Sequence, residues 1–231
     1  MTNRFNRITA LLGKSAIEKL HKSTVMVVGC GAVGSFAIES LARSGVGNIV
    51  VVDFDTVEES NINRQLFALS STIGMPKVDV AAARIRDINP DCNVIAINAF
   101  FDETTDIDIK PDFVIDAIDT VDSKIALYKW CVAKSVPFAA SMGAALKCDA
   151  SKICVGRILK TSVCPLAGRV RKMVRENGLP NFPVVYSTEM PNKSAATPGR
   201  VFGSIITVTG SFGLRLGDIA IKSIIDSQNM I

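Results

Sequence analysis

Charged and amide side chains gather in one short segment of the chain, and their types suit the binding of a nucleotide. Asp53 ends an apolar run, where a carboxylate can accept both hydroxyls of a ribose. Arg64 and Lys77 would neutralise the outer phosphates of a triphosphate. Asn61 and Gln65 can donate or accept hydrogen bonds at the sugar and the phosphates. A glycine loop alone serves the pyrophosphate of NAD, so the basic pair favours a nucleoside triphosphate.

A glycine-rich turn precedes this segment and offers a phosphate-binding backbone. The β-branched run Thr24–Val28 leads into Gly29-x-Gly31-x-x-Gly34, and a helical segment follows. Glycines let the backbone approach a phosphate, and the helix N-terminus supplies N–H donors and partial positive charge. The plainer interpretation is a turn whose glycines only allow close packing of the helix on the strand. The strand, turn, helix and Asp53 together favour a nucleotide site.

Two carboxylates end a later apolar run and are candidates for holding Mg²⁺ against the phosphates. Asp116 and Asp119 follow Phe113, at the edge of the sheet where we also expect Asp53. Mg²⁺ is commonly bound through one or two carboxylates together with substrate phosphates. The alternative is an exposed acidic loop in which Asp122 caps the helix starting at Ser123. We favour Asp119 as the metal ligand.

The histidine and cysteine content excludes several kinds of site. His21 is the one histidine, which excludes HExxH zinc sites and relays that need a second imidazole. The six cysteines include no C-x-x-C pair, so we expect no four-thiolate zinc site, and free thiols in a reducing compartment. Cys164, near basic residues, is the best candidate for a lowered pKa, although an inert thiol is favoured. We expect Cys131 in the core and Cys30 as a small residue tolerated in the glycine turn.

Composition and charge are typical of a soluble globular protein. Of 231 residues, 48% are hydrophobic and 21% are charged. The net charge of +4 is too small for wholesale coating of nucleic acid, so any basic surface must be local. The N-terminal segment lacks the apolar region of a secretory signal, and the apolar stretch Gly203–Ile225 is interrupted by Arg215, Asp218 and Lys222. We therefore expect a cytoplasmic protein that does not span a membrane.

Hydrophobic periodicity predicts alternating strands and helices. We expect strands at 24–28, 49–52, 94–97, 113–116, 137–140 and 153–157, and helices at 4–20, 34–44, 78–88, 123–134 and 166–176. A loop is expected at 181–198, and a strand or a helix packed on the sheet at 205–225. This alternation predicts an α/β fold: Rossmann-like, doubly wound, with a mostly parallel sheet and helices on both faces.

We expect a single domain over residues 1–231. Residues 1–141 would be its nucleotide-binding core, and residues 142–231 an elaboration that completes the sheet and the substrate side. The elaboration holds a run of basic residues that could follow an RNA backbone, although a solvated helix face is the plainer interpretation. The run consists of Arg157, Lys160, Arg169, Arg171, Lys172 and Arg175. Lys193 and Arg200 lie in a following loop that could cover the site.

The motifs taken together resemble those of the ATP-dependent adenylating enzymes related to ubiquitin activation, the ThiF type. They are Gly29-x-Gly31-x-x-Gly34, Asp53-x-Asp55, Ser60-Asn61-x-Asn63-Arg64-Gln65, Gly74-x-Pro76-Lys77 and Asp116-Ala-Ile-Asp119. The resemblance spans residues 4–141 and implies ATP and Mg²⁺ as cofactors. It implies that Asp53 and Asp55 belong to the nucleotide site and that Asp119 binds the metal. It implies phosphate contacts for a further set of residues, namely Asn61, Arg64, Gln65 and Lys77.

The N-terminal residues carry a second resemblance to this family. Arg4-Phe-Asn-Arg7 is similar to an element whose second arginine reaches the γ-phosphate in the neighbouring subunit. The resemblance implies a homodimer in which Arg7 acts in trans. A solvated arginine at the start of a helix is an equally good interpretation of the residue by itself.

The second half of the chain is most similar to the members of the family that cyclise threonylcarbamoyladenosine in tRNA. The similar segments are Val114–Lys124, Lys160-Thr161 with Pro165-Leu-Ala167, Val185–Glu189, Phe202-Gly-Ser204 and Phe212-Gly213. This resemblance implies ATP-dependent dehydration through an acyl-adenylate, with the modified tRNA as partner and sulfur-transfer proteins as candidate partners. The attacking atom belongs to the same modified base, so no enzyme thiol is required.

Three other functions stay open at this stage. An activator of a small sulfur-carrier protein would adenylate the C-terminal glycine of the carrier, but such activators usually carry two C-x-x-C pairs. An NAD oxidoreductase is disfavoured by Asn61, Arg64 and Lys77. A binding module without catalysis is disfavoured by the intact set of nucleotide residues.

Overall fold

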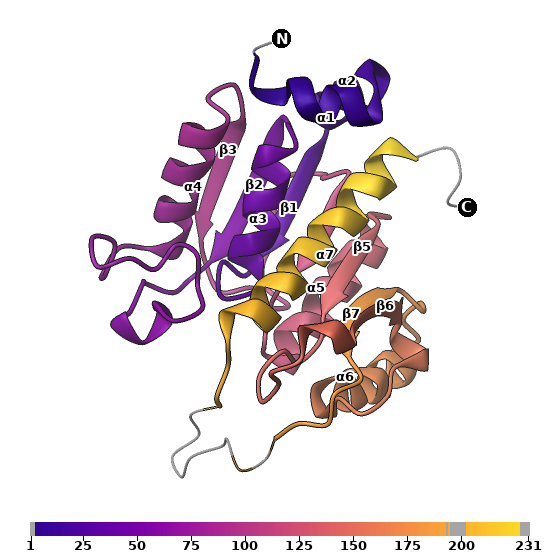
Figure 1. Cartoon of the computed structure of the whole chain (residues 1–231). Helices are drawn as coiled ribbons and strands as arrows, with labels where there is room; N and C mark the ends of the chain where they lie inside the picture. Colours follow the sequence, from indigo (N-terminus) through magenta and orange to yellow (C-terminus); the bar gives the residue numbers. More distant parts are fainter. Residues whose placement is uncertain (1–2, 193, 195–201, 227–231) are drawn as a thin grey trace.

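Seven strands form one twisted sheet in the computed structural model, which describes residues 3–192, 194 and 202–226 (Figure 1). The strand order is β3-β2-β1-β4-β5-β7-β6, and β6 alone runs antiparallel to its neighbour. The strands are β1 (Thr24–Val28), β2 (Asn48–Asp53), β3 (Asn93–Asn98), β4 (Phe113–Asp116), β5 (Phe138–Ser141), β6 (Ile153–Arg157) and β7 (Pro183–Ser187). Strand order reverses between β1 and β4, so a crevice opens at the carboxyl ends of these two strands.

The central strands are hydrophobic along their whole length because helices cover both of their faces. Val27 pairs with Val51 of β2 and with Ile115 of β4, and all three side chains are fully buried. A run of β-branched residues without polar alternation is the pattern of a parallel strand buried on two sides. The predicted α/β, doubly wound, mostly parallel fold is therefore confirmed.

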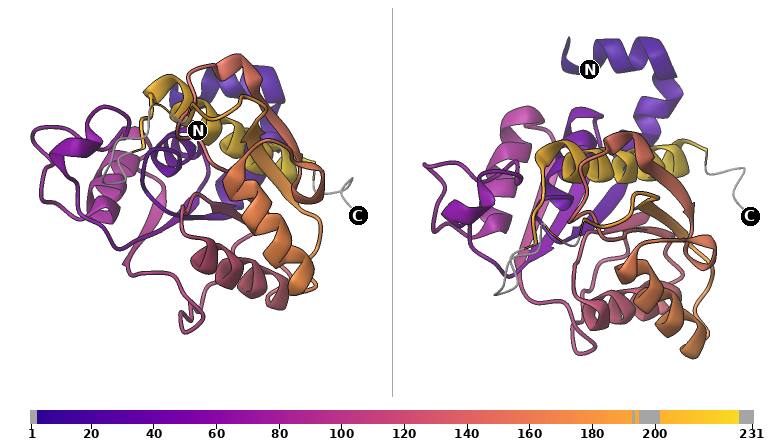
Figure 2. Two further views of the ribbon diagram at one scale, coloured as in Figure 1. Left: turned by 90° about the horizontal axis from the view of Figure 1, so that it is seen from below. Right: turned by 60° about the horizontal axis from the view of Figure 1, so that its bottom comes forward.

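Helices form two layers, one on each side of the sheet (Figure 2, left). Helices α3, α4 and α7 pack on one face with α2 at its end, whereas α5 and α6 pack on the other. The helices are α1 (Asn6–Leu12), α2 (Lys14–Lys22), α3 (Gly34–Arg43), α4 (Lys77–Ile88), α5 (Val121–Ala133), α6 (Pro165–Glu176) and α7 (Ile206–Ile225). Short 3-10 turns are η1 (Asn3–Phe5), η2 (Glu59–Asn61), η3 (Ala150–Lys152) and η4 (Ile158–Lys160). No helix among the described residues is both long and apolar enough to cross a membrane.

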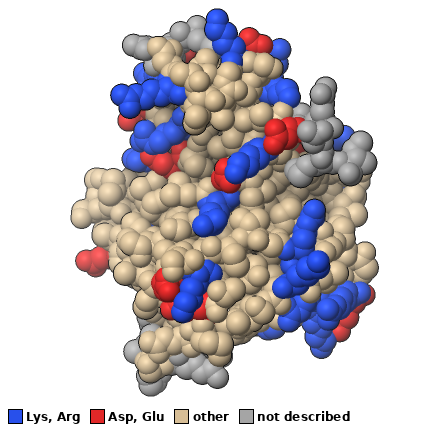
Figure 3. Space-filling model, turned by 45° about the vertical axis from the view of Figure 1, so that its right-hand side comes forward, with Lys and Arg blue, Asp and Glu red and all other residues tan. Residues whose placement is uncertain are grey.

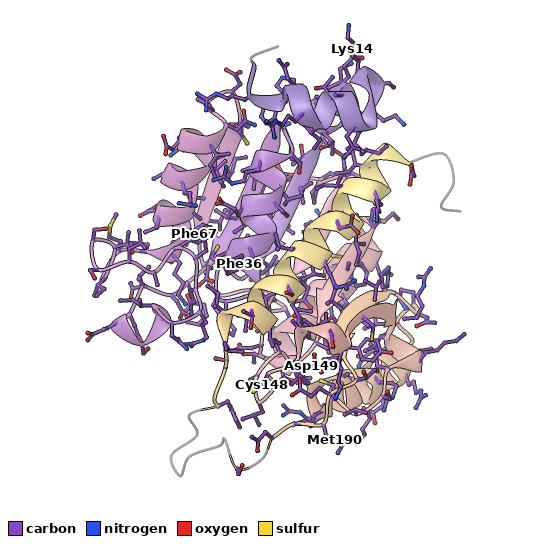
Figure 4. The ribbon with its side chains drawn as sticks, in the orientation of Figure 1. Lys14, Phe36, Phe67, Cys148, Asp149 and Met190 are labelled. Atoms are coloured by element: carbon purple, nitrogen blue, oxygen red, sulfur yellow. The ribbon has the colours of Figure 1, made fainter. Side chains whose placement is uncertain are left out.

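Helix α7 packs unusually close to α3 because glycines lie along the contact. A Cβ on Gly213 would overlap the Val33 carbonyl oxygen, and a Cβ on Gly210 would lie 3.2 Å from the ring of Phe36. Figure 4 shows Phe36 where these two helices face each other. Small residues let the two backbones approach, so α7 seals one side of the core.

Three expectations about the elements need correction or completion. The helix expected at 4–20 is divided at Gly13, whose φ of 86° ends α1 before α2 begins. The loop expected at 181–198 contains strand β7, which inserts between β5 and β6. The segment 205–225, left open between strand and helix, is α7. Lys193 and Arg200, expected in a covering loop, lie outside the described residues.

Candidate functional site

A cavity of about 790 Å³ opens at the carboxyl ends of the strands. Residues from the ends of β1, β2, β4 and β5 line it, together with the N-terminal turns of α3, α4 and α6. The loop after β5 and residues Pro191, Phe202 and Ser204 complete the wall. The parallel sheet thus brings residues that are far apart in the sequence to one edge.

The three glycines of the turn serve different purposes. Gly29 has a φ of 98°, and a Cβ there would lie 2.7 Å from the Ala117 carbonyl oxygen. A Cβ on Gly34 would overlap the Gly29 carbonyl, so this glycine allows α3 to start directly after the turn. Gly31 faces the cavity, and its nearest neighbour in that direction is Gln65 Nε2 at 3.9 Å. Packing therefore explains Gly29 and Gly34, whereas Gly31 leaves room for a ligand.

Asp53 connects the end of β2 to the glycine turn through hydrogen bonds to the backbone. Its Oδ2 accepts the backbone N–H of Cys30 at 2.5 Å, and its Oδ1 accepts the backbone N–H of Asp55 at 2.8 Å. The carboxylate is half-buried at the end of β2 and lines the cavity. Beside it, the exposed rings of Phe54 and Phe100 meet edge to face at 5.0 Å and extend the same wall.

The segment after β2 brings its basic and amide side chains into the cavity. Lys77, the first residue of α4, is 5% exposed and its Nζ lies 2.7 Å from Asp55 Oδ2. Asn61 and Gln65 are both buried in the wall. The Asn61 Oδ1 accepts the backbone N–H of Glu58 at 3.2 Å, which holds η2 in place.

Arg64 differs from Lys77 because its charge is not neutralised by an acid. Its Nη1 donates to the Ser60 carbonyl and to Asn63 Oδ1, both at 2.8 Å. Among the described residues, no carboxylate lies within ion-pair distance of this guanidinium. The side chain is therefore positioned by neutral groups and keeps its full charge for an anion.

The two aspartates after β4 have different surroundings. Asp116 is fully buried, and its Oδ2 accepts Lys124 Nζ at 2.7 Å and the Tyr128 hydroxyl at 2.5 Å. Asp119 is exposed and lines the cavity, with one oxygen accepting the Thr120 hydroxyl at 3.3 Å. Helix α5 begins at Val121 rather than at Ser123, and no side chain caps it. Asp116 thus stabilises the core, and Asp119 alone is available for a cation.

The far wall of the cavity holds Lys147, which no sequence motif singled out, and Arg169 from the predicted basic run. Lys147 lies in the loop after β5, is 2% exposed, and donates from Nζ to the Gly143 carbonyl at 2.6 Å. Arg169 projects from the first turns of α6 to the cavity rim. Burial lowers the pKa of Lys147 from its ordinary 10.5, and the nearby Cys164 and Glu189 oppose that shift. No local motif announces Lys147, because its position depends on the long-range pairing of β5 with β7.

Four of the six cysteines are buried, and Cys154 on β6 is half-buried. Cys30 and Cys131 are fully buried, and burial raises the pKa of each. Cys164 is buried at the start of α6, where its Sγ accepts the backbone N–H of Ala167 at 3.5 Å. Cys148 is exposed.

Arg7 lies outside the cavity of its own chain. It is exposed on α1, at the end of the sheet opposite to the carboxyl ends of the strands (Figure 1). Its neighbour Arg4 donates to the carbonyl of Ile88 at the end of α4 at 3.0 Å. All of the predicted nucleotide residues except Gly34 and Arg7 therefore line this one cavity.

The predicted basic run follows β6, η4 and α6. Arg171 is held by the Thr161 carbonyl oxygen at 2.6 Å and by the Thr161 hydroxyl, whereas Lys172 lies 3.7 Å from Glu176. Arg175 is exposed on the last turn of the helix. Lys and Arg side chains gather at the lower right of Figure 3 with few acidic ones among them. A local basic surface thus exists despite the modest net charge.

Comparison with known proteins identifies relatives along nearly the whole chain. The sequence model of the ThiF family matches residues 5–230. A Bacillus subtilis protein named tRNA threonylcarbamoyladenosine dehydratase is 48% identical over 195 residues, which cover 83% of this chain and 77% of that protein. The Escherichia coli protein of the same name is 33% identical over 95% of this chain and 92% of its own. The crystal structure of that E. coli enzyme, TcdA, with ATP superimposes with a TM-score of 0.90 and 34% identity, covering 97% of this chain and 95% of that one.

Proposed function

The chain belongs to the ThiF family, and on this premise we propose that it is an ATP-dependent enzyme that cyclises threonylcarbamoyladenosine in tRNA. The observation that carries the proposal is the cavity at the switch point of the sheet, where a glycine turn, a ribose-binding carboxylate and an unneutralised arginine meet. The likeness to dehydratases over nearly the whole length of the chain, including an ATP complex, supports the choice of substrate.

The proposed reaction has two steps and needs no external oxidant or reductant. A carboxylate oxygen of the substrate attacks the α-phosphorus of ATP, which forms an acyl-adenylate and releases pyrophosphate. A nucleophilic atom of the same modified base then attacks the acyl carbon. The bond between this carbon and the phosphate oxygen breaks, AMP leaves with that oxygen, and the nucleophile loses one proton. The nucleoside has then lost the elements of one water.

The residues of the cavity contribute mainly charge and alignment to these steps. Asp53 binds the ribose, and the backbone of the glycine turn lies against the phosphates. Arg64 and Lys77 neutralise charge on the phosphates, while Asn61 and Gln65 fix their orientation. Asp55 holds the Lys77 ammonium in place.

Asp119 fits a role in binding Mg²⁺ together with the nucleotide. Its carboxylate is exposed in the cavity and forms no ion pair with a described residue. The described residues contain no group of three acidic, histidine or cysteine side chains that could hold a metal without help. One carboxylate combined with phosphate oxygens is a common arrangement for Mg²⁺, which would neutralise charge on the departing pyrophosphate.

A homodimer with Arg7 acting in trans completes the proposed site. Arg7 is exposed and far from its own cavity, so only a second copy allows it to contact the γ-phosphate. The tRNA would lie along the basic residues of α6, whose N-terminal turns border the cavity. In this arrangement the modified base enters the cavity and the RNA backbone stays outside.

The test is mass spectrometry of nucleosides from tRNA that carries threonylcarbamoyladenosine, after incubation with the protein and ATP–Mg²⁺. We expect the nucleoside to lose about 18 Da, the mass of one water, and Arg64→Ala and Asp119→Ala to abolish the loss. Lys110→Ala, in the exposed loop before β4, serves as the control variant. ATP binding without any change in the nucleoside would refute the tRNA assignment. A carrier protein ending in glycine, tested by pyrophosphate exchange, would then be the next substrate to try.

A further inference from the structure

Lys147 is a buried ammonium group in the cavity wall whose hydrogen-bonding capacity is only partly used. Its Nζ has three N–H donors, and one of them is given to the Gly143 carbonyl at 2.6 Å. No carboxylate among residues 3–192, 194 and 202–226 forms an ion pair with it. With 2% of the residue exposed, water does not substitute for the missing partners as it would at the surface.

The loop that carries Lys147 is fixed from several sides. The N–H of Met142 donates to Val185 of β7 at 2.8 Å, and the N–H of Leu146 donates to Gly203 at 2.8 Å. Asn192 in turn donates its N–H to the Leu146 carbonyl at 2.8 Å. The ammonium is therefore held in place by the fold rather than by a flexible tether.

The titratable groups that act on Lys147 are Cys164 and Glu189, and the Glu189 carboxylate forms no ion pair with its ammonium. Cys164, on the neighbouring turn of α6, has its Sγ 4.0 Å from the same Gly143 carbonyl. The Glu189 carboxylate accepts the backbone N–H groups of Cys148 and Asp149, the residues labelled in Figure 4, at distances from 2.9 to 3.2 Å. The Glu189 carboxylate is thus engaged with the backbone, and Arg169, which also lines the cavity, adds a second positive charge.

We propose that Lys147 binds the carboxylate of the substrate, the group that ATP activates. This inference rests on the proposed function. A buried cation with two unused donors suits a carboxylate, which offers two oxygens in one plane. The glycine turn, Arg64 and Lys77 occupy the opposite wall, so a carboxylate held by Lys147 faces the nucleotide across the same cavity. When the modified base attacks the acyl carbon, negative charge develops on the acyl oxygen, and the Lys147 ammonium faces that oxygen.

The proposal predicts a difference in affinity between the substrate and the cyclic product. The substrate enters with a negative charge, and the cyclic product leaves without one. Lys147 therefore distinguishes substrate from product by charge alone, and the enzyme binds the uncyclised nucleoside more tightly. A hydrogen bond between charged partners corresponds to a difference of about tenfold or more in affinity.

The experiment compares two synthetic anticodon stem–loops without ATP, one with the threonyl carboxylate and one with the neutral carboxamide. We expect the wild-type protein to bind the carboxylate form about tenfold more tightly. Lys147→Met and Lys147→Gln should bind both forms with the affinity that the wild type has for the carboxamide. Lys147→Arg keeps a positive charge and should keep part of the preference. Lys152→Met, which removes an exposed ammonium on the nearby η3, should behave as wild type.

The possible results distinguish a failure of the proposed Lys147 contact from a failure of the proposed dehydratase function. Variants that melt at the wild-type temperature and still bind ATP, but retain the preference, would show that Lys147 does not contact the carboxylate. A wild-type protein that converts the carboxylate stem–loop with ATP yet shows no preference would overturn the inference and leave the dehydratase function intact. A wild-type protein that neither binds nor converts the stem–loop would overturn both.

Discussion

Single charged residues divide into two groups according to what neutralises them. Lys124 and Asp116 satisfy each other in the core, and Lys77 is paired with Asp55 at the cavity. Arg64 and Lys147 are held by neutral oxygens and form no ion pair with any described residue. Arg64 and Lys147 can meet an anionic ligand without displacing an internal partner, whereas Lys77 must share its ammonium between Asp55 and the phosphates.

Removing Lys124 should destabilise the protein strongly. In Lys124→Met, Asp116 stays buried with only the Tyr128 hydroxyl and the Ile118 N–H as hydrogen-bond donors. We expect the free energy of unfolding to fall by about 3–5 kcal/mol, measured by urea denaturation, because a buried charge loses its counter-ion. Lys129→Met breaks an exposed pair with Glu103 and should change stability by less than about 1 kcal/mol. Equal losses in both variants would contradict this role for the buried pair.

The thiols should react with iodoacetamide in an order set by burial. Burial raises the pKa of Cys92 from 9.0 to about 11 and raises the pKa of Cys30 and Cys131 as well. A raised pKa keeps the thiol protonated, so at pH 7.5 the reactive thiolate of Cys92 is about a hundredfold scarcer than at an ordinary cysteine. Peptide mapping of the native protein should find Cys148 labelled first, and labelling of Cys92 should rise as the pH is raised. Rapid labelling of Cys30 in the folded protein would contradict its burial.

At the level of elements, the fold was readable from the sequence where local pattern decides and unreadable where long-range pairing decides. The β-branched runs predict β1, β2 and β4 because these strands are buried on both faces. Strand β7 was missed because Pro183 starts it and its pairing partners lie far away in the sequence. Glycines in an apolar stretch left α7 ambiguous, since they lower helix propensity, although here they serve close packing.

The same dependence on long-range pairing explains which site residues could be predicted. Asp53, Arg64 and Lys77 lie close together in the sequence, so one segment is enough to predict a nucleotide site. Lys147 reaches the cavity only because β5 and β7 pair and fix its loop. The sequence does not distinguish Asp116 from Asp119. Only the fold shows that Asp116 points into the core, where it pairs with Lys124.

Two glycines in helices should respond to alanine in opposite ways. In Gly213→Ala, the new methyl group would collide with the Val33 carbonyl of α3, so we expect a loss of about 1–3 kcal/mol of stability. In Gly168→Ala, within α6, the methyl group meets nothing within 4 Å, so the better helix propensity should add up to about 1 kcal/mol. Thermal denaturation of both variants measures the difference. A stabilised Gly213→Ala would show that α7 and α3 do not pack this closely.

At the level of the whole molecule, the sheet separates two ends with different properties. The carboxyl ends of the strands carry the cavity, with the basic helix α6 beside it. The amino ends carry α1 and α2, where Arg7 is exposed (Figure 2, right). A site that uses both ends requires two copies of the chain.

The basic surface should bind tRNA through its phosphates. We expect Arg175→Ala to weaken tRNA binding and to lower the slope of log affinity against log salt by about one, because one phosphate contact is lost. Lys110→Ala removes a cation from the other end of the sheet and should leave the slope unchanged. Affinities measured at several salt concentrations provide the test. Identical slopes for the wild type and Arg175→Ala would place the tRNA elsewhere.

Two inactive variants should restore activity when they are mixed. In a mixed dimer of Arg7→Ala and Arg64→Ala, one cavity receives an intact Arg64 from its own chain and an intact Arg7 from the partner. Random exchange of subunits should therefore recover about a quarter of the wild-type rate of nucleoside conversion. Either variant by itself is the control. No recovery, with subunit exchange verified by labelled subunits, would mean that Arg7 does not act in trans.

The position of α7 in the chain has a consequence for how the protein is made. This helix covers α3 and contacts β4, β5 and β7, and Thr209 on it lines the cavity. Lys19 of α2 donates to the Ile225 carbonyl, so a contact of this N-terminal helix forms only after the C-terminal helix has been synthesised. While the ribosome synthesises the first two hundred residues, the part of this face over β4, β5 and β7 lacks its cover and exposes apolar surface. The nascent chain is therefore expected to need chaperone protection until residues 206–225 have left the exit tunnel, and only then to acquire the ability to bind nucleotide.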